Sequence, residues 1–314
     1  MRRVSHIALF VSLAWTYVGC IDGIAAPSTT LLASVNATTF TMGGIHACSD
    51  GDSTLCDSAS IPSITVELAA YGIEFREVTN AQYRHCVSRG FCVAPSYGGI
   101  EGAADYYRDE KYAAYPMVNI TWSMARQYCH AIGRRLPNEA EWELAARYRS
   151  AGDLSKLPVH PWGNGEWDCN KAHTAECTND GLPKGTGATL EDISELSVQD
   201  LAGNVAEWVE DIYDPFANCE GAKSYAELCA DDATCMNSKC SDDGDSCLKD
   251  CDGEQPLCRR AQGSAKGSNG NGAGELRSIR GGSYRLGKCA AVATYRAGLD
   301  PELPYPHVGF RCAR

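Results

Sequence analysis

The chain has 314 residues, with 28 Lys and Arg against 40 Asp and Glu, so its formal net charge is −12. Hydrophobic residues make up 44% and charged residues 22%, which argues against a globally disordered chain, and the acidic balance argues against a nucleic-acid or anionic-lipid surface. The 17 cysteines indicate an oxidising compartment, and their odd number requires one that is not in an intramolecular disulfide.

Residues 1–19 have the composition of an export signal. Arg2 and Arg3 precede an apolar stretch over 7–18 that is too short to span a bilayer. The stretch ends at Gly19 and Cys20, and a small residue before a cysteine is typical of a lipoprotein-processing site. Cleavage near residues 23–26, which would release a secreted protein, is the alternative. We therefore predict an exported chain, either secreted or held at a membrane through a lipid on Cys20.

The next segments predict a tether followed by a folded domain. Residues 20–37 are interpreted as the tether because 26–37 are rich in Ser, Thr and Ala. Residues 38–314 are predicted to form one domain. Within it, Ile64, Val66 and Leu68 alternate with polar residues, which predicts a half-buried strand.

Helical spacing of apolar residues then recurs three times, each time behind a residue that can cap a helix. The first helix is predicted within 76–87 behind a cap at Thr79 or Asn80, and the second over 122–132 behind Thr121. The third follows Asn138 in a capping-box pattern. Gly, Pro and Asn residues separate these elements, which favours a loop-rich α+β domain over a layered α/β fold.

An insertion at about 215–275 differs in composition from the rest of the chain. Seven cysteines lie within 219–258 among many aspartates, and 263–272 is a Gly/Ser/Asn-rich linker. The insertion has too few apolar side chains to form a core of its own. We therefore expect disulfides to hold this segment. A zinc site is the alternative, although paired CxxC spacing and histidine are both missing from the segment. The aspartates could also bind calcium loosely or simply be solvated.

Seven sequence blocks follow one another along the chain: Phe40–Gly43, Glu77–Tyr83, Pro116–Trp122, Gly133–Glu143, Asp200–Trp208, Arg280–Tyr284 and Gly309–Arg311. In this order they resemble the formylglycine-generating enzyme (sulfatase-modifying factor) family. The resemblance implies a single C-type-lectin-like α+β domain with little regular secondary structure. The Cys-rich insertion falls between the fifth and sixth blocks. Trp142 and Trp208, within two of the blocks, are expected to be core anchors rather than substrate contacts.

The resemblance also implies two structural calcium sites. Its first maps onto the side chains of Asp200 and Glu207 with the carbonyls of Gly203 and Val205, a set of oxygens that suits a hard cation. The alternative for Glu207 is that it caps local amides. The second implied site consists of Asn170, the Lys171 carbonyl, Asp180 and the Leu182 carbonyl. The stretch between Asn170 and Asp180 is shorter than the family usually has.

The family's enzymes oxidise a sulfatase cysteine to formylglycine with oxygen and a copper ion bound by two cysteines. The resemblance places that pair just after the Arg280–Tyr284 block, and it places Ser283 in the active site. In this chain the stretch over 285–293 contains one cysteine, Cys289, so the copper site is incomplete there. Two thiolates are what Cu(I) prefers, and one loop cysteine cannot supply them.

The resemblance implies a disulfide between Cys129 and Cys312. The family's other disulfide falls on Ala146 and Ala293, so both of its cysteines are missing together. Three further pairs are close enough in sequence to form locally: Cys48 with Cys56, Cys86 with Cys92, and Cys169 with Cys177. The remaining Cys289 and seven insertion cysteines make an even eight, and we expect Cys289 to be bonded to the insertion.

Three functions follow from these patterns. The first is an exported formylglycine-generating-enzyme-like domain that lacks the copper site and acts in binding or assembly with an unidentified protein or peptide. The second is a true copper oxidase in which Cys289 and an insertion cysteine supply the thiolates. The third, a related mononuclear iron oxygenase, is disfavoured because the seven histidines form no i, i+3 or i, i+4 pair.

Overall fold

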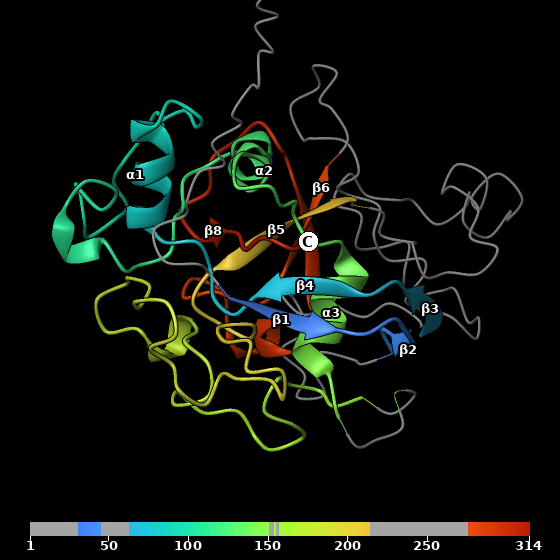
Figure 1. The fold of residues 1–314 in the computed structure, drawn as a ribbon. Helices are drawn as coiled ribbons and strands as arrows, with labels where there is room; N and C mark the ends of the chain where they lie inside the picture. Colours follow the sequence, from blue (N-terminus) through green and yellow to red (C-terminus); the bar gives the residue numbers. More distant parts are fainter. Residues whose placement is uncertain (1–30, 45–62, 151–153, 155–156, 214–275) are drawn as a thin grey trace, which may run out of the picture.

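The computed structural model describes residues 31–44, 63–150, 154, 157–213 and 276–314 (Figure 1). The predicted signal, the lipidation site at Cys20, the Cys48–Cys56 pair and the Cys-rich insertion lie outside the described residues. In the described part of the chain, no helix is both long enough and apolar enough to cross a bilayer.

A four-stranded sheet forms the centre of the molecule (Figure 1). Its strands are β5 (Ala206–Ile212), β6 (Arg277–Arg280), β7 (Arg296–Leu299) and β8 (Val308–Gly309), in the order β7-β6-β5-β8. The β5/β6 and β6/β7 pairs are antiparallel, whereas β5 and β8 are parallel. This topology places the family-like blocks at 200–208, 280–284 and 309–311 next to one another.

Two smaller antiparallel pairs lie beside this sheet: β1 (Leu32–Val35) with β4 (Tyr71–Glu74), and β2 (Thr38–Met42) with β3 (Ile64–Leu68). The β3 strand confirms the predicted alternation. The tether boundary was wrong, because β1 lies inside the stretch predicted as a tether. Ala33 and Val35 point into the core from β1, so this segment is part of the folded domain.

The three helices are α1 (Asn80–Ser88), α2 (Trp122–Ala131) and α3 (Glu139–Arg147). They begin behind the predicted caps, since the side chains of Thr79, Thr121 and Asn138 each accept a hydrogen bond from an amide of the first turn. The caps at Thr79 and Asn138 are both complete capping boxes. Helix position was therefore predicted correctly from local sequence.

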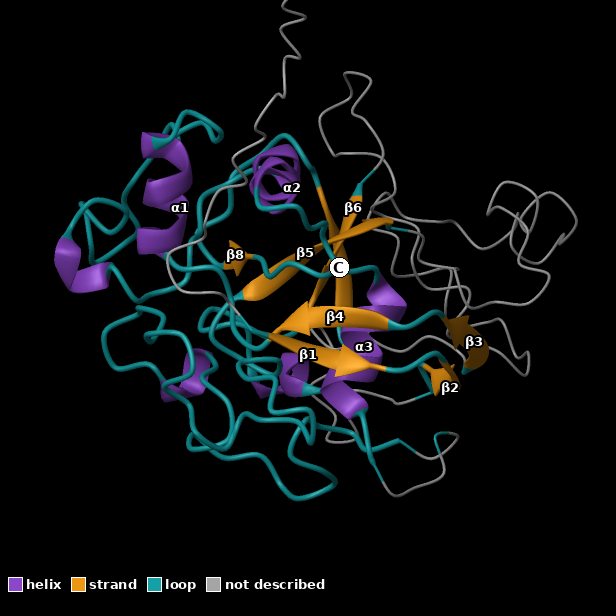
Figure 2. Ribbon diagram, in the orientation of Figure 1, coloured by secondary structure: helices purple, strands orange, loops and turns teal. Residues whose placement is uncertain are grey.

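Loops make up most of the described chain (Figure 2), and the two largest of its apolar clusters form the core. Trp208 lies in the cluster under α1 and α2, whereas Trp142 lies in the cluster between α3 and the two small sheets. Both side chains are fully buried, which confirms them as core anchors. The mixed strand and helix content agrees with the predicted α+β class.

Candidate functional site

The loop over 200–207 enters strand β5 with an unusual backbone. Asp200 and Asn204 have φ angles of 57° and 67°, in the left-handed region that Asp and Asn tolerate better than most residues. Gly203 lies so close to the next segment that an added Cβ would sit 2.5 Å from the His173 backbone nitrogen. The loop is thus fixed by residue type at three of its positions.

Glu207, at the start of β5, is held by side chains rather than by local amides. Its Oε1 lies 2.6 Å from Nη2 of Arg311, and its Oε2 accepts from Nε of Arg311 at 2.7 Å and from Nε1 of Trp142 at 2.9 Å. All three residues are fully buried. Among the described residues Arg311 is the one hydrogen-bond partner of Oε1, so this oxygen retains a lone pair for a further ligand.

Sequence reasoning missed two carboxylates that join this loop, Glu77 and Asp192. Glu77 accepts from the Val205 amide at 3.2 Å and from the Asn204 side chain at 2.8 Å. Asp192 accepts from the backbone amides of residues 201 and 202. Glu77 belongs to one of the family-like blocks, and that was its only signal in the sequence.

Four buried carboxylates therefore surround one buried guanidinium, that of Arg311: those of Glu77, Asp192, Asp200 and Glu207. Burial, helped by the charge of Asp200, raises the pKa of Glu77 and of Asp192 well above their usual range. Burial also raises the pKa of Asp200 to about 6, although the Gly187 amide and Arg311 act in the opposite direction. The cluster has more negative charge than its cation balances.

The first implied calcium set fits this environment. Oδ2 of Asp200 accepts from the Gly187 amide, while its Oδ1 is buried without a hydrogen-bond partner in the described structure. A buried carboxylate oxygen without a partner is costly, and a divalent cation would satisfy it and offset the excess charge. Within the described residues, no three His, Cys, Asp or Glu side chains are grouped to hold a metal alone, so the carbonyls of Gly203 and Val205 would be needed.

The second implied set lies on a loop closed by the Cys169–Cys177 disulfide. Asp180 lies next to Leu182 and accepts its amide at 3.1 Å, while the Leu182 carbonyl accepts from the His173 ring at 2.9 Å. Asn170 is exposed and Lys171 is half-buried, with the Lys171 ammonium paired to Asp168 at 2.8 Å. The structure therefore brings Asp180 and Leu182 together, and gives the Leu182 carbonyl another partner.

The stretch that would carry catalysis is buried up to Tyr284 but reaches the surface at Arg285 and Lys288, and Cys289 is half-buried. Ser283 is fully buried, and its Oγ accepts from the Arg285 amide at 3.3 Å. Cys289, in a 3-10 helix over Lys288–Ala291, is disulfide-bonded. Its partner is not one of the six other described cysteines, because these pair with one another. Cys289 thus offers a disulfide sulfur in this structure, not a thiolate.

Three expected disulfides are confirmed: Cys86–Cys92, Cys129–Cys312 and Cys169–Cys177. Ala146 and Ala293, which stand where the family has its other disulfide, lie in the same buried cluster. The alignment that paired these two positions is therefore consistent with the fold.

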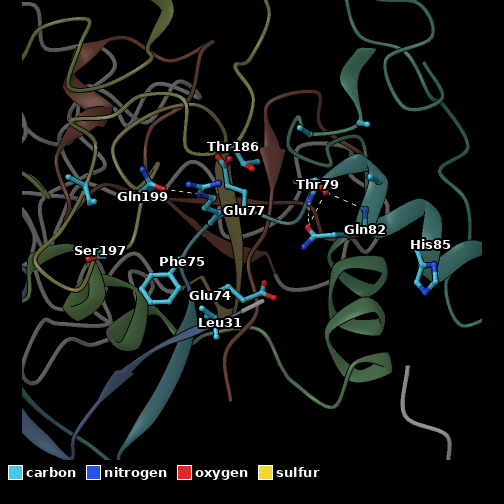
Figure 3. Close-up of a pocket in the computed structure, with 15 residues that line it drawn as sticks. Leu31, Glu74, Phe75, Glu77, Thr79, Gln82, His85, Thr186, Ser197 and Gln199 are labelled. Carbon is cyan, nitrogen blue, oxygen red and sulfur yellow. Dashed lines mark hydrogen bonds between the residues drawn. The ribbon is translucent and has the colours of Figure 1, made fainter. Parts of the chain in front are cut away.

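A groove of about 1010 Å³, lined in part by Glu77 and Gln199, was not predicted from the sequence (Figure 3). The segment 74–77 runs along it, between the first turns of α1 and the segment 193–199. In Figure 3, Ser197 and Gln199 lie on one side of Phe75, with Thr79, Gln82 and His85 on the other. No residue of the stretch 280–293 lines this groove.

A sequence profile of the family described as "Sulfatase-modifying factor enzyme 1-like domain" matches residues 25–314. The chain belongs to this family. The match covers all seven sequence blocks, three of which lie on or beside β5, β6 and β8.

Curated relatives match a shorter segment. "Inactive C-alpha-formylglycine-generating enzyme 2" of Bos taurus is 36% identical over 110 residues, which is 32% of this chain and 34% of that protein. "Formylglycine-generating enzyme" of Streptomyces coelicolor is 34% identical over 113 residues, which is 32% of this chain and 33% of that protein. The matched segment thus spans about a third of each of these relatives. Both active and inactive members are therefore similar to this domain.

Among solved structures, that of PvdO from Pseudomonas aeruginosa aligns with a TM-score of 0.55 and 22% identity, covering 90% of this chain and 92% of that one. At this identity the likeness shows the fold alone.

Proposed function

We propose that this family member works in binding or assembly and does not carry out copper-dependent cysteine oxidation. The observation that carries the proposal is the state of Cys289. Copper held by two cysteines needs two thiolates, and the 285–293 stretch has one cysteine, which is already in a disulfide. The similarity to relatives named as inactive is compatible with this proposal.

Ser283 supports the same proposal. Its hydroxyl is buried without solvent access and is used locally by the Arg285 amide. The backbone around it is close-packed, since a Cβ on Gly282 would lie 2.2 Å from the Ala202 carbonyl oxygen. A substrate peptide reaching Ser283 would need this packing to open.

The proposal includes structural calcium. The Asp200 and Glu207 carboxylates, with the Gly203 and Val205 carbonyls, would hold one ion, which would supply positive charge to a cluster that lacks it. A second ion on Asn170, Lys171, Asp180 and Leu182 has weaker support, because the Leu182 carbonyl is engaged by His173. Both would fix loops that lack strand hydrogen bonding, as in a C-type-lectin-like domain.

We further propose an exported protein, anchored through a lipid on Cys20 or secreted. The three disulfides within the described residues, together with the bonded Cys289, support an oxidising compartment. In this setting the partner would be an extracytoplasmic protein or peptide.

The alternative is the oxidase, and one observation favours it. A disulfide at Cys289 places a second sulfur within bonding distance, so its reduction would create two adjacent thiols. Such a pair would suit Cu(I), with its second cysteine from outside the 285–293 loop.

The experiment uses the full chain, before and after mild reduction. We expect Cys289 to resist alkylation until reduction. After loading with Cu(I), the reduced protein should not convert a sulfatase-type cysteine peptide to the aldehyde, as followed by mass spectrometry. A paired variant that lacks Cys169 and Cys177 controls for copper bound by unrelated thiols. Turnover that disappears in Cys289→Ser and persists in the control would replace the binding proposal with the oxidase.

A further inference from the structure

The groove beside α1 contains an exposed charged side chain, that of Arg76, which makes no ion pair with the described residues, although its charge acts to lower the pKa of Asp200. We propose that this groove binds an extended peptide segment that carries a carboxylate, with Arg76 as the anchor for that carboxylate. The inference deepens the proposed binding function, on which it rests, by giving the binding site and the ligand chemistry.

The guanidinium of Arg76 is held in place before any ligand arrives. Its Nε donates to Oε1 of Gln199 at 2.8 Å. Its flat face packs on Gly187, where an added Cβ would lie 2.5 Å from Nε and 2.7 Å from Cζ. Gly187 also has a φ of 76°, so both the backbone conformation and the lack of space for a Cβ favour glycine at this position. The side chain is thereby held in place at the lining of the groove.

The terminal nitrogens of Arg76 remain available. Neither makes a hydrogen bond or ion pair with the described residues, and the side chain is exposed. Two parallel N–H groups match the two oxygens of a carboxylate, which makes Arg the residue suited to bidentate recognition of this group. A carboxylate is therefore the ligand group that best fits the groove.

The acidic residues that line the groove do not cancel this charge. Glu74 is buried, pairs with Arg134 and accepts from the Cys312 amide. Glu77 is buried and is engaged by the 204–205 segment. The first turn of α1, which borders the groove, contains no acidic residue. Arg76 is thus left without an ion pair among the described groove residues, although its charge also acts on the buried Asp200.

The shape favours a peptide over a small acid. At about 1010 Å³ the groove is at the upper limit of small-molecule pockets, and both polar and apolar side chains line it. Backbone hydrogen bonds tie its walls together, at Thr186 N to Ala114 O (3.0 Å) and Gln199 N to Phe75 O (2.8 Å). A groove fixed in this way loses little conformational entropy when an extended chain enters it.

The test selects phage-displayed random dodecapeptides on the immobilised full chain, and then measures synthetic peptides by fluorescence polarisation. We expect the enriched peptides to share an Asp or Glu at one position. Their affinity should fall at least about tenfold when that residue becomes Asn or Gln, or when the protein carries Arg76→Gln. Arg76→Lys should lose part of the affinity, because an ammonium group keeps the positive charge but lacks the two parallel N–H groups of a guanidinium. Arg89→Gln, at the exposed C-terminal end of α1, is the matched control and should bind normally.

Three results would overturn the inference. They are the absence of enriched peptides, enrichment without a shared acid, and binding that survives Arg76→Gln in a variant whose circular dichroism and melting temperature match the wild type. Binding of N-acetyl-aspartate or succinate as tightly as the peptides would show that a small acid is the ligand instead. Failure here combined with no copper-dependent turnover would leave the non-catalytic proposal standing, whereas peptide oxidation that depends on Cys289 would remove that proposal alone.

Discussion

Arg311 and Glu207 form a buried ion pair across 104 residues of sequence, with Nη2 and Oε1 2.6 Å apart. The pair joins the segment after β8 to the first residues of β5. Because Trp142 donates to the same carboxylate, the helix α3 is linked to this pair as well. The three blocks that contain these residues thus meet at one buried charge.

This pair predicts a large effect of substituting its cation. In Arg311→Met, Glu207 and its three acidic neighbours would stay buried without a counter-charge, so the free energy of unfolding should fall by about 3–5 kcal/mol. Urea denaturation followed by tryptophan fluorescence measures the change. Arg89→Met, at an exposed position, should change it by less than about 0.5 kcal/mol. A loss below about 1 kcal/mol in Arg311→Met would mean that the cluster is neutral in the folded protein.

The unpartnered Oδ1 of Asp200 predicts a calcium-dependent stability. Calcium bound only by the folded protein should raise its melting temperature relative to EDTA, by an amount that grows with ion concentration above the Kd. Asp200→Ala should abolish most of this rise, and Asp105→Ala, an exposed carboxylate away from the loop, should preserve it. Differential scanning fluorimetry gives the comparison. An equal rise in all three proteins would place the calcium elsewhere.

Local sequence was enough to predict the helices and two of the disulfides. The N-caps at Thr79, Thr121 and Asn138 act within three residues, and Cys86 and Cys92 are six residues apart. Such features depend on neighbours along the chain, so one sequence contains all the information needed. The family resemblance added the long-range Cys129–Cys312 bond, which spacing alone could not have given.

The candidate site could not be predicted from the sequence alone, because its residues come together only in the folded chain. Glu77 and Asp192 reach the 200–207 loop from distant segments, and nothing in their local sequence marks them as its partners. Strand β1 was missed because its four residues include Ala and Ser, which have little strand preference of their own. This segment forms a strand through its pairing with β4. The groove was missed for the same reason, since Arg76 and Gln199 meet only after folding.

His307 predicts a loss of stability in mild acid. Burial, with a smaller effect of Arg285, lowers its pKa from 6.5 to about 4. The unfolded chain therefore takes up a proton between pH 6.5 and 4 that the folded chain does not, so this contribution to stability is lost as pH falls through that window. At pH 5 it should amount to at most about 2 kcal/mol.

The comparison uses His307→Gln, which removes the titrating group. Its free energy of unfolding should fall less than that of the wild type between pH 7 and pH 5, as measured in urea with calcium held constant. His130→Gln, on the exposed face of α2, should keep the wild-type slope. Parallel pH profiles for the wild type and His307→Gln would show that this ring is not desolvated.

Close packing at Gly282 predicts that the stretch around Ser283 does not tolerate even a methyl group. In Gly282→Ala the new Cβ would lie 2.2 Å from the Ala202 carbonyl oxygen and 3.0 Å from that of Ala290. Because both neighbours are backbone atoms, the two loops must separate, at a cost of about 1–3 kcal/mol. Ala202 belongs to the 200–207 loop that would bind calcium, so the stabilisation by calcium should weaken together with overall stability.

Gly165→Ala is the matched control, because its added Cβ would meet only the Trp162 ring at 3.9 Å. Urea denaturation with and without calcium separates the two effects. We expect Gly165→Ala to behave as the wild type under both conditions. If Gly282→Ala matched that control, the 281–283 backbone would have room to move, and Ser283 would be within reach of a substrate after all. A large loss of stability in Gly282→Ala would instead show that the backbone beside Ser283 cannot move, which supports the binding role proposed for this domain.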